Sequence, residues 1–230
     1  MATPKSPFPA QVLGWPFKLL AGLGVVGALA FLFLKIWSEV AEGDAQAIDT
    51  AILVHLRVAG HPDIPIGPAW LKESMIELSG LGGFTLLGLL IMAACGYLLV
   101  KGARVHAFLL AAATLSGGGA VLVLKALFGR SRPDVVDHLV SAQFLSFPSG
   151  HAANAAIVYL TIAAFAIDVE PALRARTYIL AVAMALTILV GLSRLYLGVH
   201  WPSDVAAGWA LGAGWALAWR VAASRLRPAP

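Results

Sequence analysis

The sequence predicts an all-α integral membrane protein, with six transmembrane helices and short interfacial helices between the first two. Of the 230 residues, 60% are apolar and only 12% are charged, and the mean hydropathy is +0.84. A typical soluble domain carries about 25% charged residues. Apolar runs of about 20 residues, the length that a helix needs to cross the hydrocarbon core, recur along the chain. We therefore treat residues 1–230 as one membrane domain rather than a soluble one.

The first predicted span follows a Pro-rich lead, residues 1–14, which we expect to be disordered or interfacial. Lys18 then precedes the apolar run LLAGLGVVGALAFLFL, which Lys35 and Trp37 close. A secretory signal peptide is the alternative, since it also combines a basic start with an apolar core. The run is long for such a peptide, and residues 31–36 offer no small-residue cleavage site. We therefore predict an uncleaved span.

Five further apolar runs have roughly the length of a span. They cover residues 79–100, 104–127, 152–167, 177–198 and 204–222. The run 152–167 is the weakest of them, because it is short and rich in Ala. It starts beside the sequence PSGH, so its helix would begin at the membrane surface.

A polar interval, residues 38–78, separates the first two spans. Within it Ile48, Ile52 and Leu56 recur at helical spacing, and residues 70–78 (WLKESMIEL) show a similar pattern. The interval therefore predicts one or two short amphipathic helices in the interface. Two roles fit them equally well, a path for lipid entry and a solvated connector.

The basic residues predict how the chain is oriented in the membrane. Six spans would place both termini on one side, together with nine bases: Lys5, Lys18, Lys101, Arg104, Arg174, Arg176, Arg220, Arg225 and Arg227. Apart from the bases of the motifs described below, the other side keeps only Lys35, Arg57 and Lys72. The positive-inside rule then puts the termini in the cytoplasm and the motifs on the outer face.

The net charge of +4 does not indicate nucleic-acid binding, because the chain has no basic run and no interleaved aromatic patch. The bases that flank the spans explain the excess. The single Cys95 excludes an internal disulfide.

Three polar motifs lie at predicted span ends on the same face. The first, KALFGRSRP, runs from Lys125 through Arg132; the second is FPSGH, residues 147–151; the third, residues 193–204, reads SRLYLGVHWPSD. A bilayer tolerates such charged groups only where they face a wet cavity or one another. We therefore expect the three motifs to converge on one site.

The residue types of these motifs suit a bound phosphoryl group. Lys125, Arg132 and Arg194 supply cations for its oxygens. Ser149 and Gly150 directly precede the predicted helix 152–167, whose unpaired N–H groups and dipole favour an anion. Capping of that helix by Ser149 is compatible with the same sequence.

The two histidines of the motifs can divide the chemistry between them. Asp204 follows His200 by four residues and can orient the imidazole and raise its basicity. His200 would then attack phosphorus. His151 would protonate the departing oxygen and afterwards activate water against the phosphohistidine.

At these residues the sequence resembles the type 2 phosphatidic acid phosphatase (PAP2) superfamily, which also includes bacterial acid phosphatases and vanadium haloperoxidases. The family signature, K-x6-R-P, P-S-G-H and S-R-x5-H-x3-D, is matched at every defined position by Lys125, Arg132, Pro133, Pro148, Ser149, Gly150, His151, Ser193, Arg194, His200 and Asp204. The resemblance implies a nucleophilic His200 supported by Asp204, with no required metal or cofactor. It implies phosphate binding by Lys125, Arg132, Ser149, Gly150, His151 and Arg194. For Ser193 it implies no role sharper than a structural or secondary phosphate contact.

The resemblance also narrows the substrate. Bacterial membrane members similar to this chain act on undecaprenyl pyrophosphate, phosphatidylglycerol phosphate, phosphatidate or lipid A phosphates. The outward-facing site and the short interval between Arg132 and Pro148 favour undecaprenyl pyrophosphate, recycled for cell-wall synthesis at a bacterial inner membrane. The other three lipids are the alternatives.

The sequence allows two other functions, and it leaves the role of one further residue undecided. A lipid phosphate transporter or binder would keep the same cationic pocket without turnover. A haloperoxidase is disfavoured because the chain has no large soluble portion. His138, in the loop after Arg132, either contacts a lipid head group or is a solvated loop residue. The oligomeric state is open as well.

Overall fold

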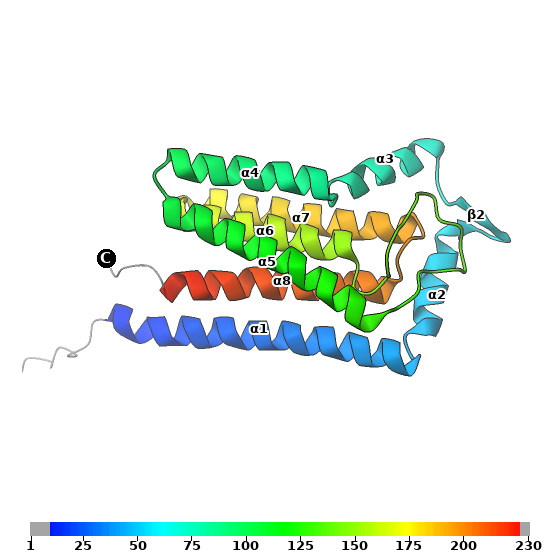
Figure 1. Cartoon of the computed structure of the whole chain (residues 1–230), viewed down its shortest axis with the longest axis horizontal. Coiled ribbons are helices and arrows are strands. Elements are labelled where there is room, and N and C mark those ends of the chain that lie inside the picture. Colours follow the sequence, from blue (N-terminus) through cyan, green and yellow to red (C-terminus); the bar gives the residue numbers. More distant parts are fainter. Residues whose placement is uncertain (1–9, 226–230) are drawn as a thin grey trace, which may run out of the picture.

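The computed structural model describes residues 10–225, which form eight helices and one β-hairpin (Figure 1). In chain order the elements are α1 (Ala10–Glu42), α2 (Gln46–His55), β1 (Arg57–Val58), β2 (His61–Pro65), α3 (Ala69–Gly80), α4 (Phe84–Val100), α5 (Arg104–Phe128), α6 (Gly150–Val169), α7 (Leu173–Tyr196) and α8 (Pro202–Arg225).

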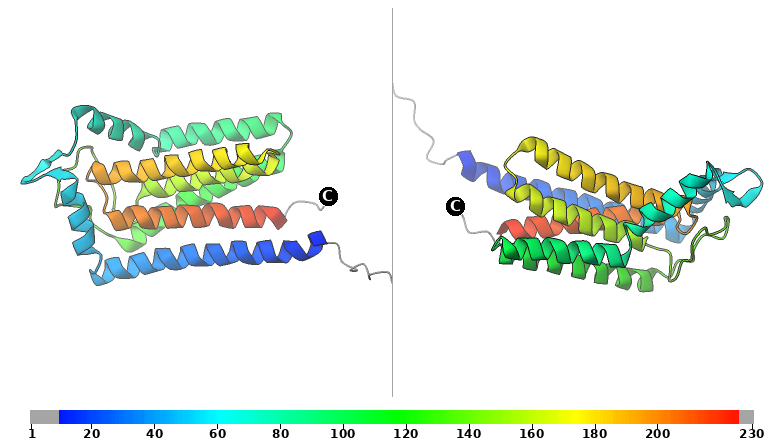
Figure 2. Two further views of the ribbon diagram at one scale, coloured as in Figure 1. Left: turned by 180° about the vertical axis from the view of Figure 1, so that it is seen from behind. Right: turned by 90° about the horizontal axis from the view of Figure 1, so that it is seen from above.

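The six long helices lie side by side in a bundle, and α2, α3 and the hairpin gather at one end of it (Figures 1 and 2). Helix α6 packs against α4, α5, α7 and α8, whereas α1 packs on α8 at the edge of the bundle. The loop 129–149, which joins α5 to α6, crosses the same end as α2 and α3 (Figure 1). The α4–α5 and α6–α7 turns lie at the opposite end.

Four helices in the described part of the chain are long and apolar enough to cross a membrane. These spans are Leu19–Glu42, Arg104–Phe128, Gly150–Asp168 and Leu173–Tyr196. They include the predicted run 152–167, which the sequence marked as the weakest. The prediction of an all-α membrane protein is confirmed, and the prediction of six spans is met only in part.

The predicted span 79–100 is broken. Helix α3 ends at Gly80, α4 begins at Phe84, and the two helices are bent by 48°, so together they make up to one further span. The glycines of SGLGGF lower the helix propensity at this point. The Tyr159 hydroxyl of α6 donates a hydrogen bond to the Leu81 carbonyl (2.8 Å), which fixes the break against the bundle.

The predicted span 204–222 lies in α8, which is long enough but is not among the helices apolar enough to cross a membrane. Helix α8 is rich in Ala and Gly and packs against α1, α5, α6 and α7. Protein rather than lipid therefore covers much of its surface, and small residues suit such close packing.

The polar segments differ from the prediction in two places. Residues 1–9 of the predicted lead lie outside the described residues, but residues 10–14 already belong to α1, so the helix starts earlier than predicted. Both amphipathic patterns of the interval 38–78 are helical, as α2 and α3. The antiparallel hairpin between them was not predicted, because strands this short show no alternation of polar and apolar residues.

Close packing brings α6 and α8 together near the end that carries the motifs. A Cβ at Gly212 of α8 would lie 2.6 Å from the Ala153 carbonyl oxygen and 3.0 Å from the Ile157 nitrogen of α6. At the starts of the same two helices, the Ser149 N–H donates to the Asp204 carbonyl (2.9 Å). Small residues on α8 therefore allow the second and third motifs to meet.

We expect Gly212→Ala to destabilise the protein by about 1–3 kcal/mol, because the added methyl group has no space against α6. The matched control is Gly119→Ala in α5, where a Cβ would meet no atom within 4 Å. Thermal unfolding of the purified proteins in detergent should give a lower midpoint for Gly212→Ala alone. Equal midpoints would show that the contact does not hold the helices together.

Candidate active site

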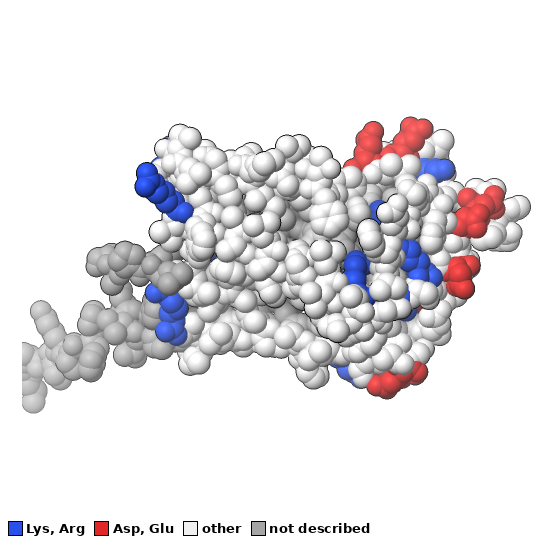
Figure 3. Space-filling view, viewed as in Figure 1, with Lys and Arg blue, Asp and Glu red and all other residues white. Residues whose placement is uncertain are grey.

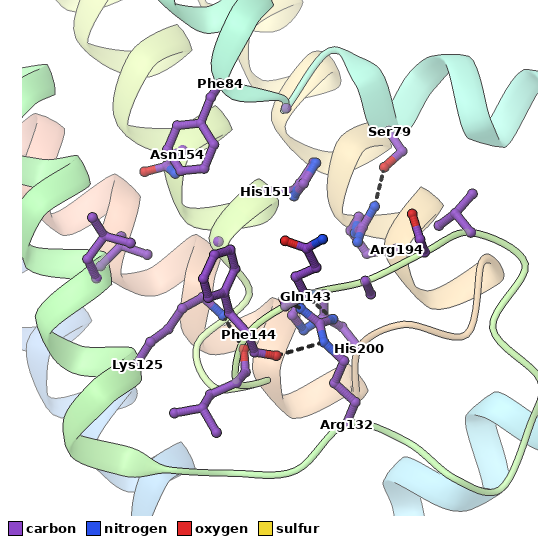
Figure 4. A pocket seen from close by; sticks show the side chains of 18 of the residues that line it. Ser79, Phe84, Lys125, Arg132, Gln143, Phe144, His151, Asn154, Arg194 and His200 are labelled. Atoms are coloured by element: carbon purple, nitrogen blue, oxygen red, sulfur yellow. Dashed lines mark hydrogen bonds between the residues drawn. The ribbon is translucent and has the colours of Figure 1, made fainter.

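The three motifs line a single cavity of about 550 Å³ at the end of the bundle (Figure 4). The cavity lies between the α3–α4 break, the end of α5, the loop 140–145, the start of α6 and the end of α7. Six of the predicted site residues line it: Lys125, Arg132, Gly150, His151, Arg194 and His200.

Backbone carbonyl groups fix Lys125, the first of the three cations that line the cavity. Lys125 lies in the last turn of α5, which ends at Gly129 in the left-handed conformation (φ +64°). Its ammonium donates to the carbonyl oxygens of Leu145 (2.6 Å) and Ser146 (3.3 Å). We call residues 143–146 the strap, because their carbonyl groups accept hydrogen bonds from Lys125 and from Arg132.

Arg132 is held by the strap in the same way. Its Nε donates to the Phe144 carbonyl (3.0 Å) and its Nη2 to the Gln143 carbonyl (2.6 Å). Its Nη1 donates to the Val199 carbonyl (2.5 Å) and lies 3.3 Å from His200 Nε2. Burial lowers the pKa of Arg132, but a guanidinium stays protonated in proteins. The strap therefore orients a permanent charge towards the cavity.

Arg194, the third cation, comes from the last turn of α7 and is 5% exposed. Its Nη1 donates to the Ser79 hydroxyl at the end of α3 (2.6 Å; Figure 4). Its buried Nε has no hydrogen-bond partner among the described residues. The last turn of α3 thus supplies a group that orients a cation of the site.

His200 lies in the turn between α7 and α8 and is almost fully buried. Its Nδ1 is 3.4 Å from Asp204 Oδ2 and 3.3 Å from the Ser146 hydroxyl, and its Nε2 faces Arg132. Because a carboxylate only accepts and a guanidinium only donates, these partners assign the proton to Nδ1 and the lone pair to Nε2.

Burial keeps this imidazole neutral. It lowers the pKa of His200 to about 3, although hydrogen bonding and charge from Asp204 act in the opposite direction and Arg132 and Arg194 disfavour the charged ring. Near neutral pH the ring therefore presents an unprotonated nitrogen to the cations of the cavity. Such a nitrogen can act as a nucleophile.

The second imidazole of the site, His151, points into the same cavity from the start of α6 (Figure 4). Asn154 follows it by one helical turn and also lines the cavity. Asn154 lies inside an apolar run, so no sequence signal marked it as a residue of the site.

Two of the predicted residues do not line the cavity. Ser149 is fully buried, and its hydroxyl has no hydrogen-bond partner among the described residues. Asp204 lies behind His200, where it accepts hydrogen bonds from the Trp201 N–H (2.9 Å) and the Ser146 hydroxyl. A third residue of the signature, Ser193, donates to the Val190 carbonyl (2.7 Å), which indicates a structural role.

His138 does not line the cavity either. Its Nε2 lies 2.8 Å from the Pro133 carbonyl oxygen, so it ties together the loop that carries Arg132. In the described part of the chain, no group of three or more His, Cys, Asp or Glu side chains could hold a metal ion.

One side of the cavity is apolar and reaches the outer surface of the bundle. It is lined by Ile76, Phe84, Val121, Leu122, Ala126 and Leu145. Phe84, at the start of α4, and Leu122 of α5 are 70% and 57% exposed. The cavity therefore joins a cationic interior to the apolar faces of α4 and α5, an arrangement that suits an anionic head group carrying a hydrocarbon tail.

A model of the PAP2 superfamily matches residues 106–228. The chain belongs to this superfamily. This PAP2 protein is similar to phosphatidylglycerophosphatase B of Bacillus subtilis (strain 168), with 33% identity over 189 residues that cover 80% of this chain and 88% of the relative. It is also similar to a lipid A 1-phosphatase of Rhizobium etli, with 34% identity over 181 residues, 66% of this chain and 73% of the relative.

A solved structure has the same fold. The crystal structure of a transmembrane PAP2-type phosphatidylglycerolphosphate phosphatase from Bacillus subtilis superposes on this PAP2 protein with a TM-score of 0.79. The match covers 88% of this chain and 97% of that chain, at 29% sequence identity. These findings confirm the family that the motifs indicated, and they support an integral membrane phosphatase.

The buried His200 should make the stability of this PAP2 protein depend on pH. Below pH 6.5 the unfolded chain protonates this ring, whereas the folded protein cannot do so until about pH 3. Folding therefore loses stability as the pH falls through this window, by about 2 kcal/mol at pH 5. Between pH 7.5 and pH 5 we expect the thermal midpoint of His200→Asn to fall less than that of the parent. The difference between the two falls should correspond to the loss of about 2 kcal/mol, because the variant lacks the buried imidazole. The same fall in both proteins would contradict a buried neutral His200.

Proposed function

We propose that this protein hydrolyses the phosphate of a membrane lipid through a phosphohistidine intermediate at His200. One observation carries the proposal. The unprotonated Nε2 of His200 lies 3.3 Å from Arg132 in the same cavity as His151, Lys125 and Arg194. A nucleophile, a second imidazole and three cations are the groups that phosphoryl transfer requires.

The phosphoryl group would bind between Lys125, Arg132 and Arg194, with the first N–H groups of α6 at Gly150 as further donors. Among the described residues, Lys125 and Arg132 each keep one N–H beyond the bonds given above. Attack by His200 would release the Nη1 donor of Arg132 to the phosphate as well. The strap thus orients the cations without using all of their donors.

In the first step, Nε2 of His200 forms a bond to phosphorus while the bond from phosphorus to the lipid oxygen breaks. His151, which takes up a proton when the anionic phosphate binds beside it, gives that proton to the lipid oxygen, and the lipid leaves. The imidazole of His200 gains a positive charge, which Asp204 stabilises through the Nδ1–H.

In the second step, water attacks the phosphohistidine and the bond between phosphorus and Nε2 breaks. His151, now neutral, accepts the proton of the water, and inorganic phosphate leaves with the site restored.

For the substrate, we propose phosphatidylglycerophosphate first. The proposal is supported by the relative that matches 80% of this chain and by the solved structure at TM-score 0.79, which are both described as phosphatases of this lipid. Undecaprenyl pyrophosphate, which the sequence analysis favoured, is the second candidate. The support for it is the predicted outer-face position of the site, where a lipid carrier used for cell-wall synthesis would be recycled.

The proposed orientation agrees with the distribution of charge. Exposed acidic residues gather at the end of the molecule that contains the cavity (Figure 3), among them Glu42, Asp44, Asp63, Glu73 and Glu77. Lys101, Arg104 and Arg174 lie at the α4–α5 and α6–α7 turns, at the other end. The positive-inside rule would place that basic end in the cytoplasm of a bacterium and the cavity on the outer face of its inner membrane.

The chemistry is tested by phosphate release from lipid in detergent micelles with a chelator present. We expect the parent to release phosphate under these conditions and His200→Ala to lose at least a thousandfold of the rate, because the nucleophile is gone. His151→Ala should slow the reaction about a hundredfold or more.

The same assay separates the phosphatase from a lipid phosphate transporter or binder. Lipid binding by the parent without any release of phosphate would favour the transporter or binder. Restoration of activity only by added metal would contradict the metal-independent mechanism.

The substrate is tested by comparing kcat/KM on phosphatidylglycerophosphate, undecaprenyl pyrophosphate, phosphatidate and a lipid A phosphate, with His200→Ala as the blank. We expect phosphatidylglycerophosphate to give the highest value. A higher value for undecaprenyl pyrophosphate would reverse the order of the two candidates and leave the chemistry unchanged.

A further inference from the structure

A second set of charges lies directly behind the proposed nucleophile, on the side away from the cavity. Arg130 donates from Nη1 to Asp204 Oδ1 (2.7 Å) and from Nη2 to Asp49 Oδ2 (2.8 Å). Asp204 in turn faces Nδ1 of His200 through its other oxygen. The order Asp49, Arg130, Asp204, His200 therefore alternates in charge up to the imidazole.

Each of these four side chains is buried or nearly so. The side chains of Asp49 and Asp204 are 3% and 0% exposed, and that of Arg130 is 11% exposed. Such burial removes most of the screening by water, so each charge acts strongly on its neighbour. The arrangement differs in this respect from an ion pair on the protein surface, which contributes little.

Asp49 is fixed in place by further bonds to the start of α8. Its Oδ1 accepts the Ser203 N–H (2.9 Å), and its Oδ2 accepts the Ser203 hydroxyl (2.5 Å). Arg130 also donates to that hydroxyl (2.7 Å) and lies over the Trp201 ring, 5.3 Å from its centroid. Helix α2 thus contacts the start of α8, directly after the turn that carries His200.

The electrostatic consequence follows from the order of charges. Without Asp49, the positive charge of Arg130 would partly neutralise the carboxylate of Asp204. That carboxylate would then stabilise less well the positive imidazole that forms when His200 attacks phosphorus. Asp49 opposes the charge of Arg130. On the other side of His200, Lys125, Arg132 and Arg194 face the cavity and disfavour a positive ring, so the support from Asp204 has to be strong.

We propose that Asp49 and Arg130 are positioning residues of this active site. Arg130 holds Asp204 in line with Nδ1 of His200, and Asp49 balances the charge of Arg130 so that Asp204 can stabilise the imidazolium. Neither side chain lines the cavity, so both act through Asp204 rather than on the substrate. The inference rests on the proposed attack by His200.

Asp49→Asn tests the inference, with Asp63→Asn as the matched control. Asp63 undergoes the same chemical change in the same interval of the chain, but it is exposed on the hairpin. The full-length proteins are compared in detergent micelles on the lipid of the four-lipid panel that the parent hydrolyses fastest. Single-turnover reactions with enzyme in excess measure the formation of acid-labile phosphoenzyme, and steady-state reactions measure kcat and KM.

We expect Asp49→Asn to slow phosphoenzyme formation and to lower kcat about tenfold, with KM changed less than twofold. Asp63→Asn should match the parent. A purely structural Asp49 would lower the amount of folded protein but leave the rate constant of the single turnover unchanged. Equal rate constants for Asp49→Asn and Asp63→Asn would therefore overturn the inference while leaving the proposed function intact.

Arg130→Lys provides the second test if Asp49→Asn does not fold. Lysine keeps the charge but lacks the planar fork that reaches both carboxylates. We expect the same tenfold loss in the rate of phosphoenzyme formation, with KM unchanged, and a parental rate would overturn the inference. A parent protein that forms no phosphoenzyme, like His200→Ala, would instead overturn the proposed function and this inference with it.

Discussion

The buried carboxylate of Asp204 is the group on which the rest of this site depends. A charge with no exposed surface is stable only if other groups of the protein replace its hydration. Here the loop after α5 supplies Arg130 and Ser146, the turn before α8 supplies the Trp201 N–H and His200, and α2 supplies Asp49 to balance Arg130. Satisfying one carboxylate thus draws three distant segments to the same end of the bundle.

The cations of the cavity are also held by hydrogen bonds to other groups of the protein. Lys125 and Arg132 donate to carbonyl groups of the strap, and Arg194 donates to Ser79, so each cation is oriented by neutral partners. Neutral partners orient a cation without neutralising it. The cavity can therefore keep a positive field for an anionic head group while its apolar side meets the lipid-facing surfaces of α4 and α5.

The sequence was most informative where the type of a residue alone determines its environment or its chemistry. Long apolar runs predicted the helices, and the three motifs predicted six residues that line one cavity. The interruption between α3 and α4 was missed because the apolar run continues through its glycines. The span 204–222 is met only in part, because the Ala- and Gly-rich helix α8 has the length of a span but not the hydropathy.

Other parts of the site could not be predicted from residue types. The strap acts through backbone carbonyls, which every residue possesses, and Arg130 pairs with an aspartate 81 positions away in the chain. The central claim, that one tetrahedral anion binds between the cations and against His200, is tested most directly by a structure with bound orthovanadate. The account predicts vanadium bonded to His200 Nε2, with its oxygens held by Lys125, Arg132 and Arg194. Vanadate bound elsewhere, or with no bond to His200, would contradict it.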